Sequence, residues 1–395
     1  MAHNVWFIAA AWMAVALLAS LISIRIGISV ALIEIFLGVI AGNFLHFQTT
    51  DWINFLATFG AGLLTFLAGA EIDPISLKTH WKPALGIGIV SFLLPFVGAW
   101  LAAYWVFGWE WRAAQIAGVA LSTTSVAVVY AVMVESGLNA TEVGKLILAA
   151  CFITDFGTVL ALGVLFATFN ASMLVFVAVL GVVLYFLPRF TRAIIQRLGA
   201  TRVSEPEVKF LFLVLFFLGG VATWVKSEAV LPAYLVGLVV AGVFLRDRVL
   251  MHRIRSIAFA LLTPFYFIKA GLYVSLPAIL AGVVVIGGLL LVKLLAKGVG
   301  VWPAGVLFGF PRRLNAYTTL LMSTGLTFGT ISALFGFENR IITQQQYTVL
   351  VTVVILSAIV PTLIAQKFFE PTKAEAGFVA GRAAPAAAPL APAND

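Results

Sequence analysis

The sequence predicts an all-α polytopic membrane protein with 13 transmembrane helices, an N-out/C-in orientation and an internal repeat. Composition is the first observation behind this fold class. Of the 395 residues, 62% are hydrophobic and only 10% are charged, whereas a soluble domain is about one quarter charged. The mean hydropathy is +1.10. These values exclude an ordinary soluble enzyme, and we attribute the net charge of +8 to cytoplasmic loops rather than to a nucleic-acid partner.

Apolar stretches of the right length are the second observation. A helix needs about 20 apolar residues to cross a hydrocarbon core of roughly 30 Å. The chain carries such stretches from end to end, and residues 371–395, which are rich in Ala and Pro, are predicted to be a disordered tail. The predicted helices cover 5–25, 29–45, 53–72, 84–107, 113–136, 141–168, 173–198, 208–225, 230–246, 256–274, 278–308, 314–336 and 345–369.

The distribution of basic residues between these helices is the third observation. If the N-terminus lies outside, 18 of the 24 Lys and Arg residues fall in cytoplasmic segments, and only Arg112, Lys226 and Arg340 fall in external ones. Cytoplasmic loops of membrane proteins carry such an excess of Lys and Arg. The asymmetry therefore predicts an odd number of spans.

Two pairs of segments resemble each other at an offset of about 200 residues. Residues 68–74 (AGAEIDP) resemble 270–277 (AGLYVSLP), and residues 120–125 (ALSTTS) resemble 321–325 (LMSTG). Corresponding helices are seven apart in the predicted order, so they cross the membrane in opposite directions. This pattern predicts an inverted-topology repeat, which is a common architecture of secondary transporters.

The two Ser/Thr clusters of this repeat fall in the middle of predicted spans. Hydroxyl groups there can satisfy backbone groups that a helix break sets free, so we expect two broken helices that meet near the bilayer midplane. Carbonyls and hydroxyls at such breaks are oxygen ligands for small cations. The alternative is that these small residues only let helices pack closely. The candidate ligands are Thr123, Thr124, Ser125, Ser323 and Thr324.

Asp155 is the strongest candidate for a functional residue. It lies mid-span in the predicted helix 141–168, and its short side chain cannot reach the interface. A charged group at such a depth costs about 2.5–3.5 kcal/mol on insertion scales. A buried carboxylate can take a proton or a metal cation such as Na⁺ or K⁺, and competition between the two is the chemistry of antiport. We assign Thr154 as a neighbouring ligand. The alternative role for Asp155 is a structural ion pair with a lysine.

Three lysines also fall within predicted spans. We expect Lys293 and Lys269 to balance the charge of Asp155 or to carry the exchanged proton, with a purely structural pair as the alternative. Lys297 lies one turn from Lys293 and nearer the cytoplasm, where a lysine side chain can snorkel to the interface. Glu71 closes its predicted helix at the cytoplasmic end, where it either lines an inward funnel or ties helix ends together.

In these residues the chain resembles the cation:proton antiporter-2 family, bacterial Na⁺/H⁺ or K⁺/H⁺ antiporters. The resemblance covers residues 1–370 and is carried by Glu34–Gly42, Gly69–Glu71, Thr124 with Ser125, Asp155 with its flanks, and Lys293 with the glycines that follow it.

The resemblance implies an antiporter fold in which two broken helices cross, and a homodimer. It implies a location in the plasma membrane, the bacterial inner membrane. The sequence carries no nucleophile elbow, His-Glu metal motif or Asp-rich phosphotransfer motif, so we expect no enzymatic activity and no cofactor. The resemblance also implies a division of labour along the chain. Scaffold helices would fall in residues 1–72 and 208–274, moving core helices in 84–168 and 278–369, and a linker helix in 173–198.

The residues and the resemblance together predict a secondary active transporter that exchanges a monovalent cation for H⁺ by elevator-type alternating access. Its partners would be Na⁺ or K⁺, protons and membrane lipid. Family members usually carry Asp-Asp or Asn-Asp at the ion site, and this chain carries Thr154-Asp155. One carboxylate fewer than Asp-Asp favours one-for-one, electroneutral exchange. The alternative is a sodium-coupled organic-anion symporter of similar fold, in which helix N-termini bind a carboxylate.

Overall fold

The protein is entirely helical in the regular structure of its described residues. The computed structural model describes residues 4–27, 29–72, 78–79, 81–138, 141–166, 171–198, 205–225, 229–245, 247–372 and 375. Most of the predicted tail 371–395 therefore lies outside the described residues. The α-helices are α1 Val5–Ile26, α2 Val30–Asn43, α3 Asp51–Ala70, α5 Trp81–Leu101, α6 Trp111–Ser122, α7 Val126–Glu135, α8 Glu142–Leu165, α9 Ala171–Leu198, α10 Pro206–Trp224, α11 Val230–Phe244, α12 Arg248–Ile257, α13 Thr263–Leu272, α14 Leu276–Ala281, α15 Val283–Leu307, α16 Arg312–Met322, α17 Thr327–Glu338 and α18 Gln344–Phe369.

Many of these helices are suited to cross a membrane. Within the described residues, 11 helical stretches are long and apolar enough to span it, and α2 and α11 are shorter apolar helices. The chain is therefore an all-helical, multi-pass membrane protein. The predicted count of 13 crossings and the N-out orientation are not decided by these lengths and stay predictions.

Local sequence explains where several helices begin. The side chains of Asn4, Thr141 and Asp247 accept hydrogen bonds from backbone N–H groups in the first turns of α1, α8 and α12. Thr343 and Gln346 form a capping box at the start of α18.

Two helix boundaries differ from the prediction. The cap at Asp247 lets the polar segment Arg248–Ile257 form α12, so this helical stretch begins before the predicted residue 256. It continues through the π-helical turn η2 (Ala258–Leu262) into α13. The predicted single helix 278–308 is instead divided at Gly282 into α14 and α15.

Both predicted helix breaks are present. Residues 123–125 separate α6 from α7, and residues 323–326 separate α16 from α17. The breaks touch, because Ser125 N donates to Thr324 O at 3.2 Å and Thr124 Oγ1 donates to Met322 O at 2.8 Å. Backbone groups that the breaks release are thus satisfied across the contact, as burial in an apolar slab requires.

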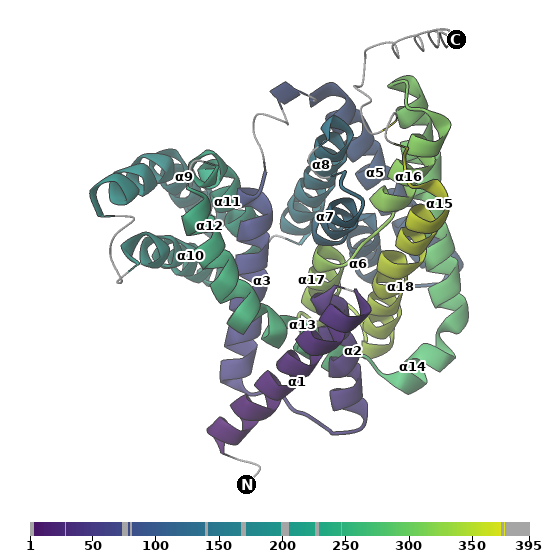
Figure 1. Ribbon diagram of the computed structural model, residues 1–395. Helices are drawn as coiled ribbons and strands as arrows, with labels where there is room; N and C mark the ends of the chain where they lie inside the picture. The colour runs from purple at the N-terminus through teal and green to yellow at the C-terminus, as the bar shows by residue number, and fades with distance from the viewer. Residues whose placement is uncertain are drawn as a thin grey trace, which may run out of the picture.

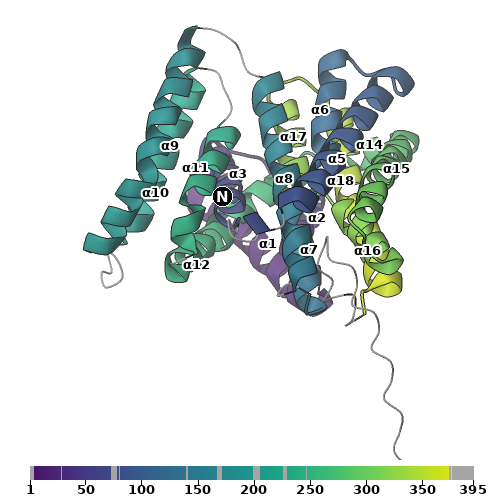
Figure 2. The ribbon, with the colours of Figure 1, turned by 90° about the horizontal axis from the view of Figure 1, so that it is seen from above.

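Two groups of helices have separate hydrophobic clusters. One cluster lies within α3, α9, α10, α11, α12 and η2, and another lies within α5, α7, α8, α15, α16 and α18 together with residues next to them. A larger cluster lies where the groups meet. Figures 1 and 2 show α9–α12 on one side of the molecule and α5, α15, α16 and α18 on the other. We call α1–α3 with α10–α13 the first group, and α5–α8 with α15–α18 the second group.

The first group contains the same close helix contact twice. Gly237 of α11 packs against the backbone of α3 at Phe66, and Gly271 of α13 packs against the backbone of α2 at Ile35. A Cβ at either glycine would overlap a carbonyl oxygen of the facing helix. α2 and α3 correspond to α11 and α13 in the predicted repeat, so this repeated contact supports it.

Candidate functional site

A cavity of about 550 Å³ runs between the two groups from Asp155 to Glu71, Lys145 and Arg255. Asp155 is contributed by the middle of α8 and is 2% exposed. Its Oδ1 atom is buried and has no hydrogen-bond partner among the described residues. A buried carboxylate oxygen without a partner is costly, so it is a position where a proton or a cation can bind.

The break residues take different places around this carboxylate. Ser125 lines the cavity together with Asp155. The remaining candidates are buried and do not line it; these are Thr123, Thr124, Thr154, Ser323 and Thr324.

Most of those buried hydroxyls bond to carbonyls of their own helix. Thr154 Oγ1 donates to Cys151 O at 2.7 Å, Ser323 Oγ to Thr319 O at 2.8 Å, and Thr324 Oγ1 to Leu321 O at 2.8 Å. Thr124 instead joins the two breaks. The structure therefore places Asp155 and Ser125 together at the cavity, with the other hydroxyls behind them.

The Lys297 ammonium binds residues at the first helix break, between α6 and α7. Its Nζ donates to Ser91 Oγ, Ser122 O and Thr124 Oγ1, each at 2.9 Å. Ser122 is the last residue of α6, so the ammonium neutralises the negative end of that half-helix. The expectation that Lys297 snorkels to the interface is wrong, because its side chain is 0% exposed. It also acts electrostatically on Asp155.

Lys293 lies on α15 one turn before Lys297, beside the second helix break between α16 and α17. It is 0% exposed, and its Nζ donates to Ser357 Oγ of α18 at 2.9 Å. The same nitrogen lies next to Gly325, where a side chain would collide with it. One helix thus supplies one ammonium to each break, since residues four apart share a helix face.

Lys269 does not pair with Asp155, in contrast to our expectation of a charge-balancing role. Its Nζ lies 2.5 Å from Glu338 Oε1 at the end of α17. The lysine is 3% exposed in its side chain, while that of Glu338 is 40% exposed. Asn54, Thr58, Tyr273 and Arg340 line the same hollow. These residues form a second polar site, which does not share the cavity of Asp155.

Glu71 satisfies both roles that the sequence left open. It lines the cavity, and its Oε1 lies 3.4 Å from Arg255 Nη2, which ties the end of α3 to α12. Burial raises the pKa of Glu71, and the Arg255 charge opposes that rise.

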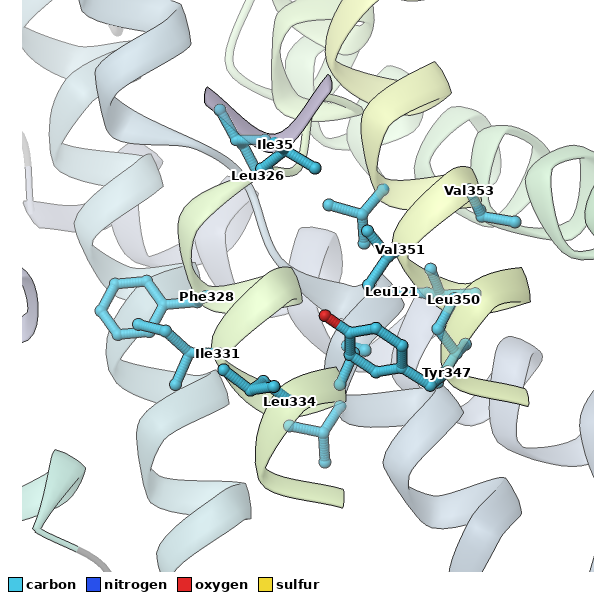
Figure 3. Close-up of a cluster of buried hydrophobic side chains, with 14 of the residues drawn as sticks. Ile35, Leu121, Leu326, Phe328, Ile331, Leu334, Tyr347, Leu350, Val351 and Val353 are labelled. Carbon is cyan, nitrogen blue, oxygen red and sulfur yellow. The ribbon is translucent and has the colours of Figure 1, made fainter. Parts of the chain in front are cut away.

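Aromatic side chains line and close the inner end of the cavity. Phe152 and Phe328 line it beside Asp155, and the Tyr234 hydroxyl donates to Phe152 O at 3.0 Å. Beyond Phe328, the side chains of α17 and α18 are packed together, as Figure 3 shows for Ile331, Leu334, Tyr347 and Leu350. The cavity of Asp155 lies at the Glu71 end of α3, whereas Glu338 lies beside Asn54 and Thr58 at the other end of that helix.

A family model described as "Sodium/hydrogen exchanger, transmembrane" matches residues 13–370. The chain belongs to the sodium/hydrogen exchanger family. It is 23% identical over 367 residues to the Na(+)/H(+)-K(+) antiporter GerN of Bacillus cereus, covering 90% of this chain and 94% of that protein. It is 25% identical over 369 residues to a Na(+)/H(+) antiporter of Enterococcus hirae, covering 88% and 93%.

A solved structure has the same fold. The sodium proton antiporter MjNhaP1 of Methanocaldococcus jannaschii superposes with a TM-score of 0.70 over 93% of this chain and 100% of that chain, at 18% identity. The structural similarity to MjNhaP1 extends over the whole membrane region of this chain. The chain therefore shares the fold of that antiporter.

Several residues at the site of this exchanger were missed by sequence reasoning. Ser91 and Ser357 hold the two buried lysines, and Arg255 and Glu338 pair with Glu71 and Lys269. A single serine in a long apolar helix is a usable signal, because it requires a partner as much as a charge does. Arg255 and Glu338 lie at helix ends and gave no such signal.

Proposed function

We propose that this protein exchanges a monovalent cation, Na⁺ or K⁺, for H⁺ at Asp155. The observation that carries the proposal is the unpartnered Oδ1 of a buried carboxylate that faces a cavity open at one side. The relative GerN is named as a Na⁺/H⁺-K⁺ antiporter, and the Enterococcus hirae protein is named as a Na⁺/H⁺ antiporter. Membership of the sodium/hydrogen exchanger family supports the same cargo for this chain.

Competition for one carboxylate couples the two ions. A cation bound at Asp155 would be coordinated by the carboxylate and by Ser125, which lines the same cavity. A proton arriving at the carboxylate removes its charge and releases the cation. Either ligand neutralises Asp155, and a neutral site can pass an apolar barrier that an ionised one cannot. Lys297 is held at the adjacent break, where its charge acts on the Asp155 carboxylate.

Movement of the second group against the first would carry the site from one face to the other. A hydrophobic cluster on each side supports this elevator-type motion, and the larger cluster between the groups is the apolar surface along which they would slide. In this proposal the first group is the scaffold of a homodimer, α9 is the linker, and the second group is the moving core. The cavity opens at the face that carries Arg255 and Lys145, which the distribution of basic residues assigns to the cytoplasm of a plasma membrane.

The single carboxylate supports electroneutral exchange. Thr154, which precedes Asp155, donates a hydrogen bond from its hydroxyl to Cys151 O and adds no charge. One cation would therefore replace one proton, and transport in proteoliposomes should generate no membrane current. A current that reverses at a potential set by both ion gradients would show another stoichiometry.

An organic-anion symporter is not favoured. A carboxylate substrate would have to lie next to Asp155, whose own charge repels it. The two candidates differ in what stabilises the purified protein. For an antiporter, Na⁺ or K⁺ should raise the melting temperature. If only bile-acid-like anions raise it, the organic-anion symporter is favoured over the antiporter.

Replacement of Asp155 tests the proposal directly. We expect Asp155→Asn to abolish cation uptake driven by a pH gradient in proteoliposomes, while the protein still elutes and melts as a folded species. Asp51→Asn, at an exposed acid at the start of α3, is the matched control and should keep full uptake. Normal uptake by Asp155→Asn would refute the assignment.

A further inference from the structure

We propose that Lys269 and Glu338 form a gate on the face opposite to the open cavity, and that they act as positioning residues in the transport cycle. The inference rests on the proposed alternating access. In this structure the gate is closed and holds the two groups together. Its opening would accompany exposure of Asp155 to the other side.

The place of the ion pair in the fold is the first step. Lys269 belongs to α13 of the first group, and Glu338 is the last residue of α17 in the second group. Their contact at 2.5 Å therefore joins two bodies that the proposed motion would displace. On the face with the open cavity, Glu71 pairs with Arg255, and Glu205 pairs with Arg253 at 2.8 Å. Those two pairs stay within the first group and its flanking segments.

The surroundings of the pair form the second step. Tyr347 of α18 donates to Ala270 O of α13 at 2.5 Å, immediately beside Lys269 in the chain. The ring of Phe337 packs against those of Tyr273 and Tyr347, with centroids 5.1 and 5.0 Å apart. Several polar and aromatic contacts between the groups thus lie around Lys269 and Glu338, and another, from Tyr234 of α11 to Phe152 of α8, lies beside the cavity. The contacts around Lys269 and Glu338 close the side of the molecule opposite to the cavity of Asp155.

The burial of the two partners explains why the contact controls access. Lys269 is 3% exposed in its side chain, so its ammonium has lost most of its water and depends on the Glu338 carboxylate. A buried charge that loses its partner is strongly unfavourable. Glu338 is 40% exposed and can be hydrated when the groups separate. The pair therefore stabilises the closed arrangement, and its loss shifts the equilibrium towards the state open on the opposite side.

Hydrogen–deuterium exchange of the purified full chain tests the gate. We expect Glu338→Gln to shift the ratio of the two access states by about tenfold towards the state that is open on the side of Lys269. The substitution removes the partner of Lys269 in the closed arrangement, whereas in the open arrangement the two residues are already apart. Amides of 263–275 and 335–345 should exchange faster, while amides of α7 beside the cavity exchange more slowly as that side closes. If the substitution only loosened the structure locally, amides of 263–275 and 335–345 would exchange faster but amides of α7 would not exchange more slowly.

Two further variants make the result decisive. The double exchange of Lys269→Glu with Glu338→Lys restores the contact with reversed charges and should bring both sets of amides back towards the original rates. Glu205→Gln removes a carboxylate that is 36% exposed from an ion pair within the first group, while Arg253 keeps Glu207 as a partner at 3.1 Å. It should leave the access ratio unchanged.

Several results would overturn the gate. They are unaltered exchange in Glu338→Gln, faster exchange at both faces, or an equal response in Glu205→Gln. This readout needs no transport. Failure of the gate is therefore distinguishable from failure of Asp155 as the ion site, which the uptake assay of Asp155→Asn reports alone.

Discussion

The contact between the two helix breaks makes Thr124→Val the most informative substitution in the core. The Thr124 hydroxyl donates to Met322 O at 2.8 Å and accepts from Lys297 Nζ at 2.9 Å. Valine has nearly the same shape but removes both hydrogen bonds and leaves a buried carbonyl and an ammonium proton without partners. Each such group costs about 1–3 kcal/mol, so we expect a loss of about 2–6 kcal/mol.

The expected change in melting temperature follows from the size of the protein. Unfolding entropies per residue for globular proteins, applied to 395 residues, convert that loss into a decrease of roughly 2–7 °C. Thermal unfolding in detergent, followed by intrinsic tryptophan fluorescence at one scan rate, measures it. Exchange activity should fall as well, because Lys297 loses one of the three hydrogen bonds that hold it at the break.

Thr330→Val is the matched control. Thr330 is also fully buried, but its hydroxyl donates to Leu326 O, which accepts a second hydrogen bond from Thr330 N at 2.9 Å. Valine there leaves no group without a partner, so stability should change by less than about 1 kcal/mol. Equal stabilities of the two variants would refute the importance that we assign to the contact between the breaks.

Two further predictions concern the first group. Gly237→Ala should lower the melting temperature, because its Cβ meets the backbone of α3, whereas Gly242→Ala in the same helix meets open space and should be neutral or slightly stabilising. Equal melting temperatures would contradict the close contact of α3 with α11. Burial raises the pKa of Glu71 and so favours its neutral form in the folded protein. Its contribution to stability is therefore present at acid pH and is lost as the pH rises through the pKa of the folded state. Glu71→Gln should match the original chain at low pH and become relatively more stable as the pH increases, and a constant difference across the range would contradict this.

Sequence reasoning was most successful where the membrane itself imposes the pattern. An acid in the middle of an apolar run and hydroxyl clusters at mid-span are both unfavourable in hydrocarbon, so each required an explanation that the fold supplies. Asp155 does face a cavity, and 123–125 and 323–326 do interrupt their helices. The limits of the helices were also close to the prediction wherever apolar length alone determined them.

The partners of the buried lysines could not be predicted in the same way. Sequence shows that Lys269, Lys293 and Lys297 need partners, but not which helix provides them. Glu338 pairs with Lys269 from the end of a helix 69 positions away in the chain, and Ser91 binds Lys297 across 206 positions. Such pairings depend on how helices pack, and one sequence contains no record of those contacts.

The start of α12 shows a different limit. Arg248–Ile257 carries three arginines, so the predicted span begins only at 256, yet the cap at Asp247 begins the helix before them. Hydropathy locates the apolar part of a helix, whereas capping and tertiary contacts with Glu71 and Glu205 determine its true end.

The proton count of cation binding tests the central claim most directly. Calorimetric titration of the purified protein with Na⁺ or K⁺, repeated in buffers of different ionisation enthalpy, gives the number of protons released per bound cation. The competition at Asp155 predicts release of about one proton per bound cation at a pH where the free carboxylate is protonated, and none in Asp155→Asn. Cation binding without proton release in the original chain, or equal release in Asp155→Asn, would contradict a shared site at this carboxylate.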